Sequence, residues 1–315
     1  MIISSAIRLA QREGVKIPHV VSSAIEHPSV RNPLLEWHKR GYCEVSFVAT
    51  SKETGAVPAD AVLAAIQPTT CLVTIMHANN ETGVVQPLEE IGKGIRRLNS
   101  DRHLAEHRVL FHTDAAQSIG KIPFRALDVN YVSVVGHKVY GPRIGCVCMS
   151  DPERQPLLPI MYGGHQEMGS RPGTENTPMI AGLGEAVALA VERVGDFRER
   201  VGPIRDLFES ELLSAFGDRL RVNFQGSDRL PNTSNFVLEG LDCSARELLA
   251  KCDRFCASTG AACHAGKVEV SRVLTSCGLT EEQAARAFRV SFGSSSDAEH
   301  ARIVVRELAE KASFS

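Results

Sequence analysis

The feature that most constrains the fold is an alternation of short apolar runs with helical segments through the first half of the chain. Most of the runs are nearly continuous in Val, Ile, Leu and Ala, which is typical of parallel strands buried on both faces. The segments at 59–68 and 88–99 repeat apolar residues at helical spacing. The pattern predicts an α/β domain with a mainly parallel sheet covered on both faces, its strands lying within 18–27, 43–50, 71–83, 108–118 and 129–138.

A second, smaller unit is predicted after residue 195. A chain of 315 residues exceeds the usual size of a single core, so two domains are expected. An apolar-rich helix at 178–194 closes the first domain, and helical periodicity at 197–217 leads onward. Strands with Gly-rich ends then follow at 221–226, 234–240 and 288–294. An amphipathic helix closes the chain at 298–312. We therefore predict a large domain over 1–195 and a small α+β domain over 196–315.

Composition argues against two classes of partner. The net charge of −2 and the lack of a long basic run give no support for nucleic-acid binding. No apolar stretch reaches the roughly 18 residues of a membrane span.

The nine cysteines form no CxxC pair, which in a chain of this length indicates reduced thiols and a cytoplasmic protein.

Polar side chains directly follow four of the predicted strands. Parallel strands point their carboxyl ends to one edge of a sheet, and α/β proteins bind ligands outside that edge. Any one of these residues alone would be explained as ordinary loop polarity, but four segments at one edge favour a binding site. We expect the following residues to converge there: His27, Asn79, Asn80, Asp114, Gln117, His137 and Lys138.

These groups match the needs of pyridoxal 5′-phosphate (PLP). A lysine amine can form a Schiff base with an aldehyde, and a carboxylate can hold a proton on a pyridine nitrogen. An imidazole can stack on the ring and move protons, while amides can hydrogen-bond a phenolate oxygen. A zinc site is the competing interpretation, because His112, His137 and Asp114 are possible ligands. No HxxxH or CxxC spacing supports zinc and Lys138 would be unexplained, so we predict PLP and no metal.

Several long motifs resemble one enzyme family. They lie in the family's order and span nearly the whole chain: "MHANNETGVVQPLEEIG", "FHTDAAQSIGK", "VGHKVYGPRIG", "GGHQEMGSRPGTENTPMIAGLGEA" and "STGAACHAG". The chain is thereby identified as a member of the cysteine desulfurase and selenocysteine lyase family of class-V aminotransferases. The resemblance implies a fold-type I, PLP-dependent aminotransferase-like enzyme that acts on a small amino acid as a homodimer.

The resemblance also assigns the residues around the cofactor ring. Lys138, in "GHKVYGP", would form the Schiff base, and Asp114, in "HTDAAQS", would pair with the pyridine nitrogen. Gln117 and Asn80 would contact the phenolic oxygen. His27, in "EHPSV", would stack on the ring and serve in proton transfer.

Further residues are implied at the phosphate and the substrate. His137 and its neighbour Gly136 would hold the phosphate, while Thr174, in "RPGTEN", would reach the phosphate of the neighbouring subunit. Arg289, in "FRVSFG", would clamp the substrate carboxylate, a task that suits the guanidinium fork.

Cys263 joins Lys138 and His27 as a predicted catalytic residue. The surrounding "ASTGAACHAGKVEVS" is rich in Gly, Ala and Ser, which suits a mobile loop that brings a thiol over the cofactor. A deprotonated thiol is a strong nucleophile. Composition alone would favour an incidental loop cysteine, whereas the match to the family's GxAC motif favours a residue that takes up the leaving chalcogen.

Three functions stay open at this point. The first is a selenocysteine lyase, which gives L-alanine and reduced selenium. The second is a cysteine desulfurase, which gives alanine and a Cys263 persulfide for a sulfur acceptor protein. The third is a shortened, non-catalytic homologue that dimerises with or modulates an intact enzyme. This third function is kept because the family's Gly-Thr-Glu loop, which binds the cofactor phosphate, is absent from the sequence. Met1 stands where the helix after that loop would continue, so we expect weakened cofactor binding.

Overall fold

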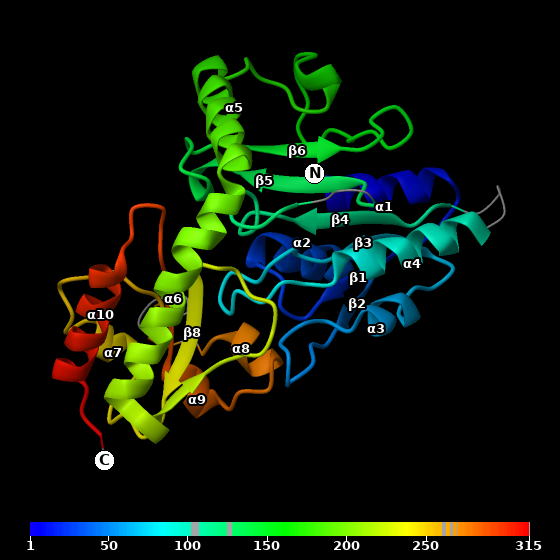
Figure 1. Ribbon diagram of the computed structural model, residues 1–315. Coiled ribbons are helices and arrows are strands. Elements are labelled where there is room, and N and C mark those ends of the chain that lie inside the picture. Colours follow the sequence, from blue (N-terminus) through cyan, green and yellow to red (C-terminus); the bar gives the residue numbers. More distant parts are fainter. Residues whose placement is uncertain (102–106, 125–127, 260–262, 265–266, 269, 315) are drawn as a thin grey trace.

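A six-stranded sheet forms the centre of the first half of the chain (Figure 1). The computed structural model describes residues 1–101, 107–124, 128–259, 263–264, 267–268 and 270–314. The strand order is β2-β1-β3-β4-β5-β6, in which the first five strands are parallel and β6 runs antiparallel to β5. The strands are β1 (His19–Ser23), β2 (Glu44–Val48), β3 (Thr70–Thr74), β4 (Leu110–Asp114), β5 (Tyr131–Val135) and β6 (Gly145–Met149). The predicted mainly parallel sheet is confirmed.

Helices cover both faces of this sheet. On one face Leu72 of β3 packs in a cluster with residues of α1 (Ile2–Arg12) and α2 (Pro28–Lys39). On the other face the next residue, Val73, packs with residues of α3 (Ala59–Ala64) and α4 (Leu88–Asp101). Successive side chains of a strand point to opposite faces. Every residue of β1 and β3 is buried for this reason, which explains the continuous apolar runs in the sequence.

A small antiparallel sheet follows, in the order β11-β8-β7. Its strands are β7 (Leu220–Val222), β8 (Thr233–Leu238) and β11 (Ala287–Ser291). One face packs on α6 (Val194–Phe216), α7 (Ala245–Leu249) and α10 (Ala298–Lys311), around the stacked rings of Phe236 and Phe288. The opposite face packs on α8 (Arg272–Ser276) and α9 (Glu281–Ala285), and also on Ile25 and Met76 of the large sheet's loops.

The remaining elements are short or connect the two sheets. Helix α5 (Thr177–Glu192) is separated from α6 by Arg193 alone. Three single turns are η1 (Gly136–Lys138), η2 (Glu167–Gly169) and η3 (Gly217–Arg219), and a two-residue ladder pairs β9 (Cys263–His264) with β10 (Lys267–Val268). The division of the chain at residue 195 stays a prediction. No helix within the described ranges is long and apolar enough to cross a membrane.

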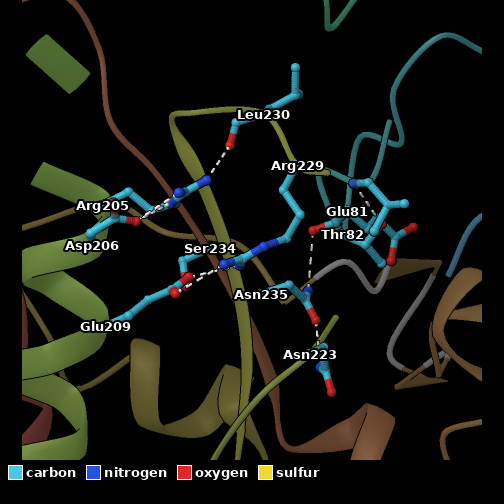
Figure 2. A network of polar contacts seen from close by, with 11 residues as sticks. Glu81, Thr82, Arg205, Asp206, Glu209, Asn223, Arg229, Leu230, Ser234 and Asn235 are labelled. Atoms are coloured by element: carbon cyan, nitrogen blue, oxygen red, sulfur yellow. Dashed lines mark hydrogen bonds and ion pairs between the residues drawn. The ribbon is translucent and has the colours of Figure 1, made fainter. Parts of the chain in front are cut away.

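A buried ion pair joins the segment before β8 to α6 (Figure 2). Arg229 donates from both Nη atoms to the carboxylate of Glu209 on α6, at 2.8 and 3.1 Å, and Ser234 Oγ donates to the same carboxylate at 2.8 Å. The next residue, Leu230, donates its backbone N–H to the carbonyl oxygen of Gly83. A pair held this way is costly to break, because one buried charge would be left alone.

Candidate active site

The sequence-predicted polar residues follow the carboxyl ends of the parallel strands. Asp114 is the last residue of β4, and Lys138 ends the η1 turn directly after β5. His27 lies four residues beyond β1 and caps the N-terminus of α2. Asn80 lies six residues beyond β3. All four therefore stand on the edge where an α/β sheet binds its ligands.

Asp114 and His27 are electrostatic neighbours. Burial raises the pKa of the Asp114 carboxyl, while a hydrogen bond from the backbone N–H of Ala116 and the nearby His27 lower it. The His27 ring is exposed, and its Nδ1 accepts a hydrogen bond from the backbone N–H of Ser29 at 3.2 Å. This bond fixes the ring at the start of α2 beside the carboxylate.

A buried carboxyl, that of Glu26, directly precedes His27 in the chain. Glu26 is fully buried, and its Oε1 accepts hydrogen bonds from Ser23 Oγ (2.6 Å) and from the backbone N–H of Met76 (2.9 Å). Its Oε2 has no hydrogen-bond partner among the described residues. Burial raises the Glu26 pKa to about 8, and the charge of Asp114 acts in the same direction. Arg272 of α8 donates to the Glu26 backbone carbonyl at 3.0 Å.

The turn that carries Lys138 is tightly built. A Cβ on Gly136 would lie 2.6 Å from the carbonyl oxygen of Pro142 and 2.8 Å from that of Ile144, so only glycine fits there. Tyr140 follows with a φ of 62°, and its hydroxyl accepts a hydrogen bond from the backbone N–H of Ser294 at 2.8 Å. The turn is thereby tied to the segment after β11. A lysine that must hold one place beside a cofactor needs such a support.

The two asparagines after β3 differ in their contacts. Asn79 Oδ1 accepts from the backbone N–H groups of Glu81 and Thr82, at 2.9 Å each, and so holds the turn. The Asn80 side chain makes no such bond within the described ranges. Its Oδ1 is buried and has no hydrogen-bond partner among the described residues, as expected of an amide that faces a polar ligand.

Arg289 of β11 reaches this turn from the small sheet. Its Nη1 donates to the carbonyl oxygen of Asn80 at 2.7 Å. Burial lowers the Arg289 pKa, and the nearby Glu81 raises it. Glu81 is itself buried, which raises its pKa to about 7, and its Oε2 accepts from Ser271 Oγ at 2.5 Å. Asn235 donates to the Glu81 carbonyl oxygen at 3.2 Å (Figure 2), so β8 and β11 both contact the turn.

Gln117 leads to a lysine that the sequence analysis missed. Lys121 Nζ donates to the Gln117 carbonyl oxygen at 2.8 Å and to its Oε1 at 3.4 Å. Lys121 and Lys138 line the same cavity of about 310 Å³. Burial lowers the Lys121 pKa to about 8, and the charges of Lys138 and Arg289 act in the same direction. Lys121 is therefore connected to Gln117 by hydrogen bonds, to Lys138 by a shared cavity, and to Arg289 by electrostatic repulsion.

Within the described ranges, no side-chain interaction links His137 or Thr174 to the other predicted residues, and the side chain of Cys263 lies outside those ranges. His137 is exposed on η1, next to Lys138. Thr174 is exposed on the loop before α5, and no interaction within the described ranges links it to the site. The Cys263 backbone lies in β9, but its side chain falls outside what is described. Its segment nevertheless starts beside the site, because Ser258 pairs with Arg289 through two backbone hydrogen bonds.

The residues at the sheet edge fit PLP in their chemistry. They supply an amine for an aldehyde, a partly buried carboxylate for a pyridine nitrogen, an imidazole, and two amides. One of the amides, that of Asn80, has a buried oxygen that no described residue hydrogen-bonds. Residues that could hold a metal ion do not gather in groups of three or more anywhere within the described ranges.

Comparison with known proteins gives the family. Residues 3–304 match the aminotransferase class-V family. The chain belongs to the class-V aminotransferases. Bovine (Bos taurus) selenocysteine lyase is 45% identical over 299 residues, which cover 93% of this chain and 68% of that protein. A cysteine desulfurase of Nostoc sp. is 36% identical over 279 residues, covering 88% of this chain and 66% of that protein.

Solved structures agree with this family assignment. A NifS-like protein superposes with a TM-score of 0.84 at 26% identity, covering 98% of this chain and 78% of that one. The predicted aminotransferase-like fold is therefore confirmed, and class-V aminotransferases are typically PLP-dependent.

The residues that sequence reasoning missed had weak signals. Lys121 follows Gln117 by four residues in "QSIGK", the spacing of one helical turn, yet a single lysine after a turn is usually exposed. Glu81 follows the asparagine pair in "ANNET". Its burial depends on Ser271 and Asn235, which are far away in the sequence.

Proposed function

We propose that the chain is a PLP-dependent lyase that takes selenium from L-selenocysteine and releases L-alanine. The observation that carries the proposal is the hydrogen bond from Arg289 to the backbone of Asn80, at 2.7 Å. It holds a guanidinium at the sheet edge that also presents Lys138. The 45% identity to bovine selenocysteine lyase supports the choice of substrate.

Each side chain then has a task. PLP, when bound, supplies an electron sink that stabilises negative charge on the substrate carbon. Arg289 binds the substrate carboxylate through its planar fork. Asp114 would hold a proton on the pyridine nitrogen, and Gln117 and Asn80 would contact the phenolic oxygen. Lys138 Nζ and the His27 ring move protons to and from the substrate carbons.

Cys263 is proposed to receive the selenium. The Cβ–Se bond breaks, its electron pair passes to carbon, and that carbon takes up a proton to give the methyl group of alanine. A new S–Se bond forms on Cys263, and the thiol proton balances the one that alanine gains. A selenium acceptor protein or a thiol would then remove selenium from Cys263.

Cysteine desulfurase activity is the second candidate. The 36% identity to a Nostoc cysteine desulfurase favours it, and it would use the same residues. L-Cysteine would then replace L-selenocysteine, with a Cys263 persulfide as the product for a sulfur acceptor protein. A homodimer and a cytosolic location also stay predictions, as does the role of Thr174 at a neighbouring subunit's cofactor.

The test is alanine release by the purified chain with added PLP, measured with each amino acid. We expect faster release from L-selenocysteine than from L-cysteine, and at least a tenfold loss of both in Cys263→Ser. Cys256→Ser is the matched control, because this exposed cysteine lies seven residues earlier. Faster release from L-cysteine would make the chain a desulfurase. Release from neither would contradict both activities and favour a non-catalytic homologue.

A further inference from the structure

Lys121 carries a buried amine that has no role in the proposed reaction. Its side chain is only 8% exposed. Both hydrogen bonds of its Nζ within the described ranges go to Gln117, and no carboxylate pairs with it there. A buried charge without an opposite charge is costly, and such groups concentrate at functional sites.

The surroundings of Lys121 are cationic. The positive charges of Lys138 on η1 and Arg289 on β11 both lower the pKa of Lys121. Arg193 and Arg200, at the α5–α6 junction and on α6, line the cavity that Lys121 shares with Lys138. No acidic side chain belongs to the described lining. The cavity therefore favours a negatively charged group near Lys138.

The hydrogen bonds of Lys121 also fix the Gln117 side chain. A glutamine amide has one acceptor oxygen and one NH2 donor. Because Lys121 Nζ can only donate, its contact with Gln117 Oε1, at 3.4 Å, requires the acceptor end of the amide to face Lys121. The NH2 end is then left to donate to an oxygen of a ligand. A free amide could turn either end toward that oxygen.

We propose that Lys121 is a positioning residue, which holds the Gln117 amide with its NH2 group toward the phenolic oxygen of PLP and adds a positive charge beside Lys138. This inference rests on the proposed function, because it names how one cofactor contact is oriented. Lys121 acts through Gln117 and through its charge, not by touching the substrate.

Two readouts separate this role from a merely structural one. The first is the pH midpoint of the visible band of the PLP-loaded chain, which reports the proton on the nitrogen that joins Lys138 to the cofactor. A nearby positive charge disfavours that proton, so Lys121→Met should raise the midpoint by about one unit. Lys121→Arg, which keeps the charge and the donors, should restore it. Lys93→Met, on the surface of α4, is the matched control.

The second readout is PLP affinity in a double-mutant cycle. Lys121→Met should weaken PLP binding about tenfold, as the loss of a hydrogen bond of about 1.4 kcal/mol would do. In a Gln117→Leu background the same change should cost much less, since the two residues act together.

The outcomes distinguish the inference from the function on which it rests. A Lys138-dependent band with unchanged midpoint and affinity in Lys121→Met would overturn the role of Lys121 alone. Equal losses of affinity with and without Gln117 would also overturn it. If the unaltered chain shows no Lys138-dependent band, the proposed function fails and the role of Lys121 fails with it.

Discussion

Arg289 Nη1 lies 2.7 Å from the carbonyl oxygen of Asn80, although the two residues are 209 positions apart in the chain. The contact joins the small antiparallel sheet to the edge of the large parallel sheet. Within the described ranges, the second Nη of Arg289 makes no hydrogen bond that would compete with a ligand carboxylate. The substrate site of this chain is therefore expected to need both sheets.

Arg289→Lys tests that expectation. A lysine keeps the positive charge but cannot bind a carboxylate through two parallel hydrogen bonds. Losing one charge-assisted bond, worth about 1.5–3 kcal/mol, should lower kcat/KM for L-selenocysteine by about 10- to 100-fold, mainly through KM. Arg286→Lys is the matched control, because Arg286 pairs with Glu282 and lies outside the site. An Arg289→Lys variant with unchanged kcat/KM would remove Arg289 from substrate binding.

Gly136→Ala tests the packing of the lysine turn. The added Cβ would overlap two backbone carbonyl oxygens, those of Pro142 and Ile144. Neither can move freely, so we expect a loss of about 1–3 kcal/mol in the free energy of unfolding and weaker PLP binding. Urea denaturation and a PLP titration measure the two effects.

Gly184→Ala is the control for that experiment. Gly184 lies within α5, and a Cβ there would meet nothing within 4 Å. Alanine is favoured over glycine inside a helix by about 0.5–1 kcal/mol, so this variant should be slightly more stable. Equal destabilisation by both substitutions would mean that the turn around Gly136 is not as tight as described.

The raised pKa of Glu26 predicts that the free energy of unfolding depends on pH. Its pKa is raised from 4.5 to about 8 in the folded chain. The folded state therefore binds a proton more tightly than the unfolded state, and the free energy of unfolding falls as the pH rises from about 4.5 to about 8. Glu26→Gln removes this titration. The variant should match the unaltered chain at about pH 4 and below, and exceed it above pH 8 by up to a few kcal/mol.

Urea denaturation at several pH values measures this difference. Glu90→Gln, exposed on α4, is the control that should leave the pH profile unchanged. Parallel profiles for Glu26→Gln and the unaltered chain would show that Glu26 is ionised in the folded state at neutral pH.

The sequence was most informative where chemistry and local pattern coincide. Continuous apolar runs predicted the parallel sheet, and the polar residues after them predicted which edge carries the site. Asp114 ends a strand, and His27 and Lys138 each lie within four residues after one. Their positions therefore depend on local structure and on the common direction of the strands.

The contacts between distant segments could not be predicted in this way. The approach of Arg289 to Asn80 depends on how the small sheet packs on Ile25 and Met76. The burial of Lys121 depends on the cavity wall formed by α5 and α6. Neither arrangement leaves a periodic signal in the sequence, because each is a product of tertiary packing.

The central claim is that Lys138 binds PLP at the edge of the large sheet. Its most direct test is a visible absorption titration of the purified chain with PLP, beside Lys138→Ala and the surface control Lys93→Ala. We predict a saturable visible absorption band from a lysine–PLP linkage in the unaltered chain and in Lys93→Ala but not in Lys138→Ala. The same band in Lys138→Ala, or no band in any of the three, would contradict the account.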